Sequence, residues 1–144
     1  MARGYPDDFG NNVFPSFGNY ISDTDTINQA ASGSDSIVDL VAPGILSDFQ
    51  VICSGMDDFS AHYINIEIDG NSIMNWRFDG LFDVLSAPHA PHRLSCYNYD
   101  IIQKSVGILL SREINFHTSC KITLSSSITE GMVIQYWFGY YAVE

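Results

Sequence analysis

Residues 62–78 read HYINIEIDGNSIMNWRF, and this stretch decides the fold class. Every second side chain from His62 to Ile68 falls on one face, and three of those four are isoleucines. Because successive side chains of a strand point to opposite sides, this period of two predicts a half-buried β-strand. Asp69-Gly70-Asn71 is typical of a tight hairpin turn, so the chain should return through SIMNWRF. We expect His62 to be a strand residue whose hydrogen bonds are satisfied.

Strand-like stretches recur on both sides of this hairpin. They are SIVDLVA (36–42), DFQVICSGM (48–56), SVGILLS (105–111), EINFHTS (113–119), CKITLSSSI (120–128) and the last stretch, MVIQYWFGYYAV (132–143). Eight strands with mostly short turns predict an all-β protein, an antiparallel β-sandwich for which an eight-stranded jelly roll is the best match. Residues 80–100 interrupt the pattern, and we expect a helical turn from Leu81 to Leu85 and then a long loop.

Residues 1–35 differ in composition from the predicted sandwich domain, residues 36–144. They are rich in Gly, Asn, Ser and Asp and show no sustained period of 2 or 3.6. Aromatic side chains nevertheless recur every three to five residues, at Tyr5, Phe9, Phe14, Phe17 and Tyr20. This pattern predicts an extended N-terminal arm with spaced aromatic anchors, laid either on its own domain or on a neighbouring subunit.

The composition excludes several classes of function. The 144 residues carry 17 acids against six Lys and Arg, a net charge of −11, so free binding to nucleic acid is not expected. No apolar run reaches the roughly 18 residues that a membrane span needs, and the N-terminus has no apolar signal region. We expect synthesis in a cytosol, with the charge serving solubility or attracting a basic partner.

Candidate catalytic and metal sites are weak. His89, His92 and Cys96 have a spacing that three metal ligands could use, but a fourth ligand is not evident. Three Asp-rich pairs lack the twelve-residue calcium-loop pattern and are better explained as turn residues, namely Asp57-Asp58, Asp23-x-Asp25 and Asp69-x-Asn71. There is no nucleophile motif or phosphate loop, so we expect neither an enzyme nor a cofactor. Cys53, Cys96 and Cys120 are expected to be buried free thiols.

The last strand is apolar on both faces. Alternation places Met132, Ile134, Tyr136, Phe138 and Tyr140 on one face and Val133, Gln135, Trp137, Gly139 and Tyr141 on the other. A strand of this kind is covered on both sides. One face should meet the core, and the arm, the middle loop or another subunit should cover the other. Large aromatic side chains favour a subunit interface, for which the candidates are Tyr136, Trp137, Tyr140 and Tyr141.

The arm at 5–20, the hairpin EIDGNSI (67–73) and the segment GMVIQYWFGYYAV (131–143) together resemble viral structural proteins. The likeness is to jelly-roll head decoration, or cement, proteins of bacteriophages. It implies a homotrimer that binds a major capsid protein on the capsid surface of a virion assembled in the host cytoplasm. The alternative is a glycan- or receptor-binding module of a phage tail or spike, in which Trp76, Trp137 or Tyr141 would stack on a sugar.

Overall fold

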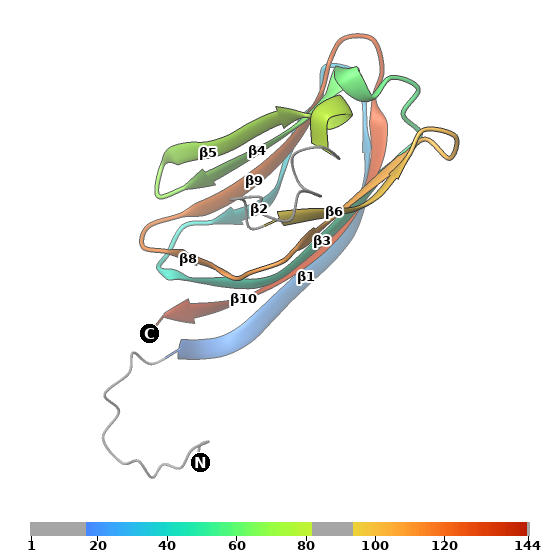
Figure 1. Cartoon of the computed structure of the whole chain (residues 1–144). Coiled ribbons are helices and arrows are strands. Elements are labelled where there is room, and N and C mark those ends of the chain that lie inside the picture. Colours follow the sequence, from blue (N-terminus) through green and yellow to red (C-terminus); the bar gives the residue numbers. More distant parts are fainter. Residues whose placement is uncertain (1–16, 82–93, 144) are drawn as a thin grey trace, which may run out of the picture.

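The computed structural model describes residues 17–81 and 94–143, which form two antiparallel sheets packed face to face (Figure 1). The larger sheet has the order β1-β10-β3-β7-β6, and β8 pairs with β3 beside β7. Its strands are β1 (Phe17–Gln29), β3 (Gly44–Ser54), β6 (Leu94–Asp100), β7 (Ser105–Leu110), β8 (Ile114–Phe116) and β10 (Met132–Val143).

The smaller sheet has the order β2-β9-β4-β5. Its strands are β2 (Ser34–Leu40), β4 (His62–Ile68), β5 (Asn71–Arg77) and β9 (Cys120–Ser126). Two short 3₁₀ turns, η1 (Phe59–Ala61) and η2 (Phe78–Gly80), flank the β4–β5 hairpin at one end of the sandwich. The prediction of an all-β antiparallel sandwich is therefore confirmed.

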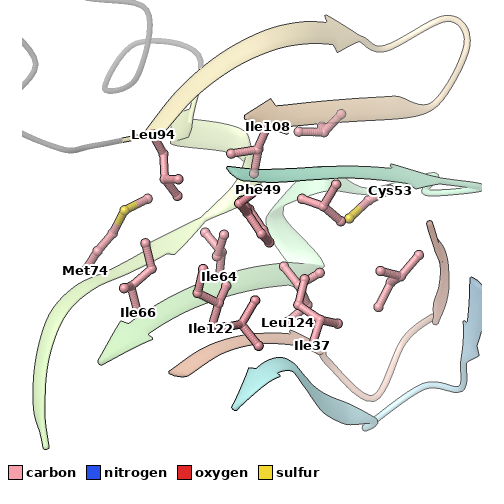
Figure 2. Packing of buried hydrophobic residues seen from close by; sticks show 14 of the residues in the cluster. Ile37, Phe49, Cys53, Ile64, Ile66, Met74, Leu94, Ile108, Ile122 and Leu124 are labelled. Carbon is pink, nitrogen blue, oxygen red and sulfur yellow. The ribbon is translucent and has the colours of Figure 1, made fainter. Parts of the chain in front are cut away.

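The core lies between the two sheets and is built from alternate residues of their strands. Figure 2 shows Ile64, Ile66, Ile122 and Leu124 of the smaller sheet pointing toward Phe49 and Ile108 of the larger one. In β9 every second residue from Cys120 to Ser126 is buried, while the residues between them are partly exposed. The period of two in the sequence therefore correctly predicted which side chains of β9 face the core and which face outward.

The predicted hairpin turn is confirmed. β4 ends at Ile68 and β5 begins at Asn71, which leaves Asp69 and Gly70 as the two turn residues. Both have positive φ, 54° at Asp69 and 84° at Gly70, as a type I′ turn requires. The Asp69 carboxylate also accepts hydrogen bonds from the backbone N–H groups of His117, Thr118 and Ser119, so the hairpin tip anchors the segment before β9.

The predicted arm at residues 1–35 is wrong over residues 17–35. Phe17–Gln29 is strand β1, paired with β10 at Phe17 and from Tyr20 to Gln29, and β2 begins at Ser34. The sandwich therefore includes residues 17–35, which the prediction had assigned to the arm. Periodicity missed β1 because it is an edge strand whose middle carries only polar side chains, Ser22 to Thr26. Tyr5, Phe9 and Phe14 lie outside the described residues.

The prediction of a long middle loop is also wrong over its last residues, 94–100. Leu94–Asp100 is strand β6, which pairs with β7 and buries Leu94 and Cys96. The alternation there lasts only those two apolar residues, which is too short for periodicity to detect. The chain enters a helical conformation at Leu81, and the rest of the expected turn to Leu85, like Pro88 and Pro91, lies outside the described residues.

Candidate functional site

The strongest candidate site is the outer face, by which we mean the side of the larger sheet that points away from the core. Strand register sets its composition, because residues paired across neighbouring strands point to the same side. Trp137 of β10 lies between Thr24 of β1 and Gln50 of β3, and Gln135 lies between Thr26 and Ile52. The centre of this face therefore holds one indole surrounded by amides, hydroxyls and a single aliphatic side chain.

Four large aromatic side chains remain exposed on or beside this face. The exposed fractions are 39% for Tyr20, 44% for Tyr97, 40% for Trp137 and 38% for Tyr141. The rings of Tyr20 and Tyr141 are 5.1 Å apart between centroids, a distance typical of favourable ring pairs. These rings keep about two-fifths of their area exposed although each already packs against its own sheet, so they could bury more area against a partner.

Two of the tyrosines lie over glycines of neighbouring strands. A Cβ atom at Gly107 would lie 2.5 Å from Cζ of Tyr97, and one at Gly139 would overlap the Tyr20 hydroxyl. Glycine at these two positions therefore lets each ring lie flat across the sheet. The Tyr97 hydroxyl accepts a hydrogen bond from Nε2 of Gln50, at 3.0 Å, so its orientation is fixed.

Tyr20 is held by a carboxylate. Its hydroxyl donates to Oδ2 of Asp48 at 2.7 Å, and this bond, with smaller contributions from desolvation and charge, raises the pKa of Tyr20 to about 12. The Ser47 hydroxyl also donates a hydrogen bond to Oδ2 of Asp48, so this carboxylate accepts from two hydroxyl groups. The aromatic rings of the outer face are thus preorganised by neighbours of the same sheet.

A shallow hollow of about 290 Å³ opens beside Trp137. It is lined by Thr24, Asp25, Thr26, Gln50, Ile52, Gln135, Tyr136 and Trp137. Thr24 uses its hydroxyl to donate to the carbonyl of Tyr136, whereas no hydrogen bond of the Gln135 amide is present within the described residues. The hollow therefore combines one exposed indole with polar groups that can still accept or donate hydrogen bonds.

The inner face of β10 is used differently. Met132, Ile134 and Phe138 are buried, and Tyr136 and Tyr140 are half-buried at either side of Phe138. The expected division of β10 into two faces is correct. Of the four interface candidates, Trp137 and Tyr141 point outward, while Tyr136 and Tyr140 pack against the core; their role in an interface stays a prediction. The expected intramolecular cover over Trp137 is absent within residues 17–81 and 94–143.

A buried polar network joins both sheets around His62. The ring Nδ1 lies 2.9 Å from Oγ of Ser126, and Nε2 lies 2.7 Å from Oε2 of Glu130. His62 is fully buried, so the prediction of a strand histidine with satisfied hydrogen bonds is confirmed. Sequence reasoning did not find its partners, because Ser126 and Glu130 are more than 60 residues away.

The order Ser–His–Glu is also that of a hydrolytic triad, but the proton directions are different. Gln29 donates through Nε2 to Leu124 O and to Asp35, so its Oε1 is the acceptor for the Ser126 hydroxyl, at 2.6 Å. Ser126 in turn accepts from Nδ1 of His62. A nucleophilic serine must give its proton to the histidine, whereas this one gives its proton to an amide. The arrangement fits a structural network.

Of the three predicted metal ligands, the structure describes one. Cys96 is buried in β6, and His89 and His92 lie outside the described residues. Within the described residues, no three His, Cys, Asp or Glu side chains come together as a metal site. Asp57 pairs with Lys104, Asp58 caps η1 through the N–H of Ser60, and Asp69 caps the segment before β9. These contacts fit the turn roles expected of Asp57, Asp58 and Asp69, whereas the turn predicted at Asp23-x-Asp25 is wrong, because both residues lie within strand β1.

All three cysteines are free and buried, as predicted. Burial raises the pKa of the Cys53 and Cys96 thiols, and raises that of Cys120 to about 12 with a smaller contribution from Asp69. Thiols of this kind are inert side chains of the core.

Comparison with known proteins adds no relationship: no family model and no curated protein matches the chain. Within residues 17–81 and 94–143 there is no helix long and apolar enough to cross a membrane.

Proposed function

We propose that this protein is a structural subunit of a virion, a capsid decoration or cement protein that assembles through its outer face. The observation that carries the proposal is the exposure of Tyr20, Tyr97, Trp137 and Tyr141 around one sheet face of a sandwich whose core is otherwise well buried. Exposed aromatic patches on soluble domains mark contact surfaces, and Tyr and Trp are the side chains most used at their centres.

The strand order supports the jelly-roll reading on which this proposal draws. The order β1-β10-β3-β7 opposes β2-β9-β4-β5, so the chain passes from one sheet to the other at most of its connections. Two four-stranded antiparallel sheets linked in this way are the pattern expected of two interleaved Greek keys. β6 and β8 would then be additions to the eight-stranded arrangement.

The energetics favour a contact through the face. Apolar area removed from water contributes about 25 cal/mol per Å², so several half-exposed rings can hold subunits together without a covalent link. A homotrimer bound to a major capsid protein would use this area, and the net charge of −11 would keep free subunits apart and favour a basic docking surface. The location would be the capsid surface.

The test measures mass and capsid binding together. Light scattering should show that the wild-type chain is an oligomer. If the chain assembles only on a capsid lattice, it should instead cosediment with expanded bacteriophage heads in preference to unexpanded heads. Trp137→Asp places a charge in the contact and should abolish both. Ile128→Asp is the control, because Ile128 is 83% exposed in the turn before β10. A wild-type chain that stays monomeric and binds no head would reject the proposal.

A glycan-binding module is the second candidate, and the hollow beside Trp137 favours it. A pyranose could stack on the indole while Gln50 and Gln135 hydrogen-bond its hydroxyls. Trp76 lies on β5 of the other sheet and would not take part. A glycan array followed by tryptophan fluorescence titration separates the two candidates, since only this one requires saturable sugar binding that Trp137→Ala removes while the chain stays monomeric.

A further inference from the structure

The edge strands of the two sheets are protected in different ways. Edge strands expose unpaired backbone groups, so they invite pairing with other chains, and proteins commonly counter this with β-bulges, short strands or inward-pointing charges. Within the described residues the edge strands are β1 and β6 in the larger sheet, with the three-residue β8 that pairs with β3 alone, and β2 and β5 in the smaller one.

Three of these strands are short and carry a bulge. β2, β5 and β6 have seven residues each. The pairing register skips Ile37 in β2, Ile73 in β5 and Tyr97 in β6, so each strand has one extra residue there. A bulge bends the strand and breaks the regular spacing of its free N–H and C=O groups. A second chain could not pair along the full length of any of these three edges.

β1 is long, and its one irregularity lies at its start, between Phe17 and Tyr20. It is 13 residues long, and its register with β10 is regular over the ten residues from Tyr20 to Gln29. Within the described residues its other side pairs with no strand. By length and regularity it is the best template for strand addition in this molecule.

Two outward N–H groups in the middle of β1 are, however, already hydrogen-bonded. The N–H of Thr24 donates to Oδ1 of Asp23 at 2.9 Å, and the N–H of Thr26 donates to Oδ1 of Asp25 at 2.7 Å. Alternate N–H groups of an edge strand point away from its partner, and these two are the central pair of the four, from Ser22 to Asn28, that an incoming strand would have to bond. Each is capped by the side chain that precedes it.

The charges act in the same direction. Asp23 and Asp25 lie opposite Phe138 and Tyr136, so both carboxylates are on the side of the sheet that faces the core layer, yet both remain exposed at the edge. A second copy paired antiparallel about Thr24 would bring four carboxylates together, and like charges across a strand pair are destabilising.

We infer that Asp23 and Asp25 close the β1 edge to strand addition by capping the N–H groups of Thr24 and Thr26. A second chain then does not extend the larger sheet at β1, whatever the outer face binds. The inference stands on the hydrogen bonds and register of β1 and is independent of the function proposed for the outer face.

The experiment compares two double variants. Asp23→Asn/Asp25→Asn keeps an Oδ1 acceptor and removes the charge, whereas Asp23→Ala/Asp25→Ala removes both. Asp39→Ala/Glu67→Ala makes the same change in net charge on the smaller sheet and serves as the control. Circular dichroism establishes that each variant is folded. Amide hydrogen exchange by NMR then gives protection factors along β1, and light scattering gives mass as a function of concentration.

In the wild type, the N–H groups of Thr24 and Thr26 should be about tenfold better protected than those of Ser22 and Asn28, which point to the same edge without a cap. The Ala variant should lose this difference and gain mass with concentration, with new protection at Ser22 and Asn28 as edges pair. The Asn variant and the control should match the wild type. If both the Asn and the Ala variants associate, the charge of the two side chains and not their capping of N–H groups protects the β1 edge. If neither variant associates, Asp23 and Asp25 do not close the edge at all.

Discussion

The hydrogen bond between His62 and Glu130 should contribute more to stability than any ion pair that Lys or Arg forms in the described part of the chain. A double-mutant cycle tests this, with His62→Ala, Glu130→Ala and the two combined. His62 is fully buried and Glu130 is 18% exposed, so solvent can replace little of the 2.7 Å hydrogen bond between them. Hydrogen bonds to charged groups contribute about 1.5–3 kcal/mol, and a neutral bond such as that to Ser126 about 1 kcal/mol.

The single variants should differ in size. His62→Ala loses both bonds and leaves a cavity and an unsatisfied Ser126, so the free energy of unfolding should fall by about 3–4 kcal/mol. Glu130→Ala also loses the acceptor for the Asp58 N–H, at 3.2 Å, and should cost about 2–3 kcal/mol. The double variant should cost less than the sum, with a coupling energy of about 1.5–3 kcal/mol.

Urea unfolding at pH 7, followed by circular dichroism, provides the measurement. The control is the Arg77–Asp79 pair, whose bonds are 2.9 and 3.1 Å but whose side chains are 58% and 36% exposed. Its coupling energy should stay below about 1 kcal/mol, as for other surface pairs. Equal coupling in the two cycles would refute the reasoning, because burial would then have no effect on the strength of the bond.

Three further predictions concern other parts of the sandwich. Backbone N–H groups, that of Thr118 most of all, hold the pKa of Asp69 at about 2 against an ordinary value of 3.8. The ionised carboxylate therefore stabilises the fold above pH 4, and this contribution is lost as the pH falls toward 2. Asp69→Ala should flatten this part of a curve of unfolding free energy against pH. Cys53, Cys96 and Cys120 should not react with a thiol reagent in the native protein, and three thiols should titrate in denaturant. Removal of residues 1–29 deletes β1 and uncovers the β10 edge, so light scattering should detect aggregation; a truncated chain that stays monomeric with native circular dichroism would contradict the assignment of β1 to the sandwich.

The sequence predicted the fold class wherever one face of a strand had to be apolar. In β4 and β9 every second residue meets the opposite sheet, so the period of two was unmistakable. β1 gave no such signal because Asp23 and Asp25 occupy the positions that would otherwise face the core layer. An edge strand beyond the reach of the opposite sheet needs no apolar face, and its sequence then resembles that of a loop.

The candidate site could be predicted only in part, for a related reason. Alternation correctly separated Trp137 and Tyr141 from Ile134 and Phe138 along β10. It could not show that Tyr97 of β6 and Tyr20 of β1 frame the same face, since this depends on which strands are neighbours of β10 and β3. The glycines gave a signal that went unused: Gly107 and Gly139 interrupt apolar strands where a tyrosine of the next strand crosses them.

The apolar side chains of β10 have different explanations on the two sides of the larger sheet. Toward the core, Ile134 and Phe138 are buried by the smaller sheet, so their apolar character is explained by the described chain alone. Toward solvent, nothing within residues 17–81 and 94–143 covers Trp137 and Tyr141 in this way, although Thr at these positions would keep the strand and avoid exposed aromatic area. Fixed rings beside them, with Tyr20 bonded to Asp48 and Tyr97 to Gln50, lower the entropy lost when a partner binds. An exposed face that is both aromatic and preorganised is better explained by binding than by folding.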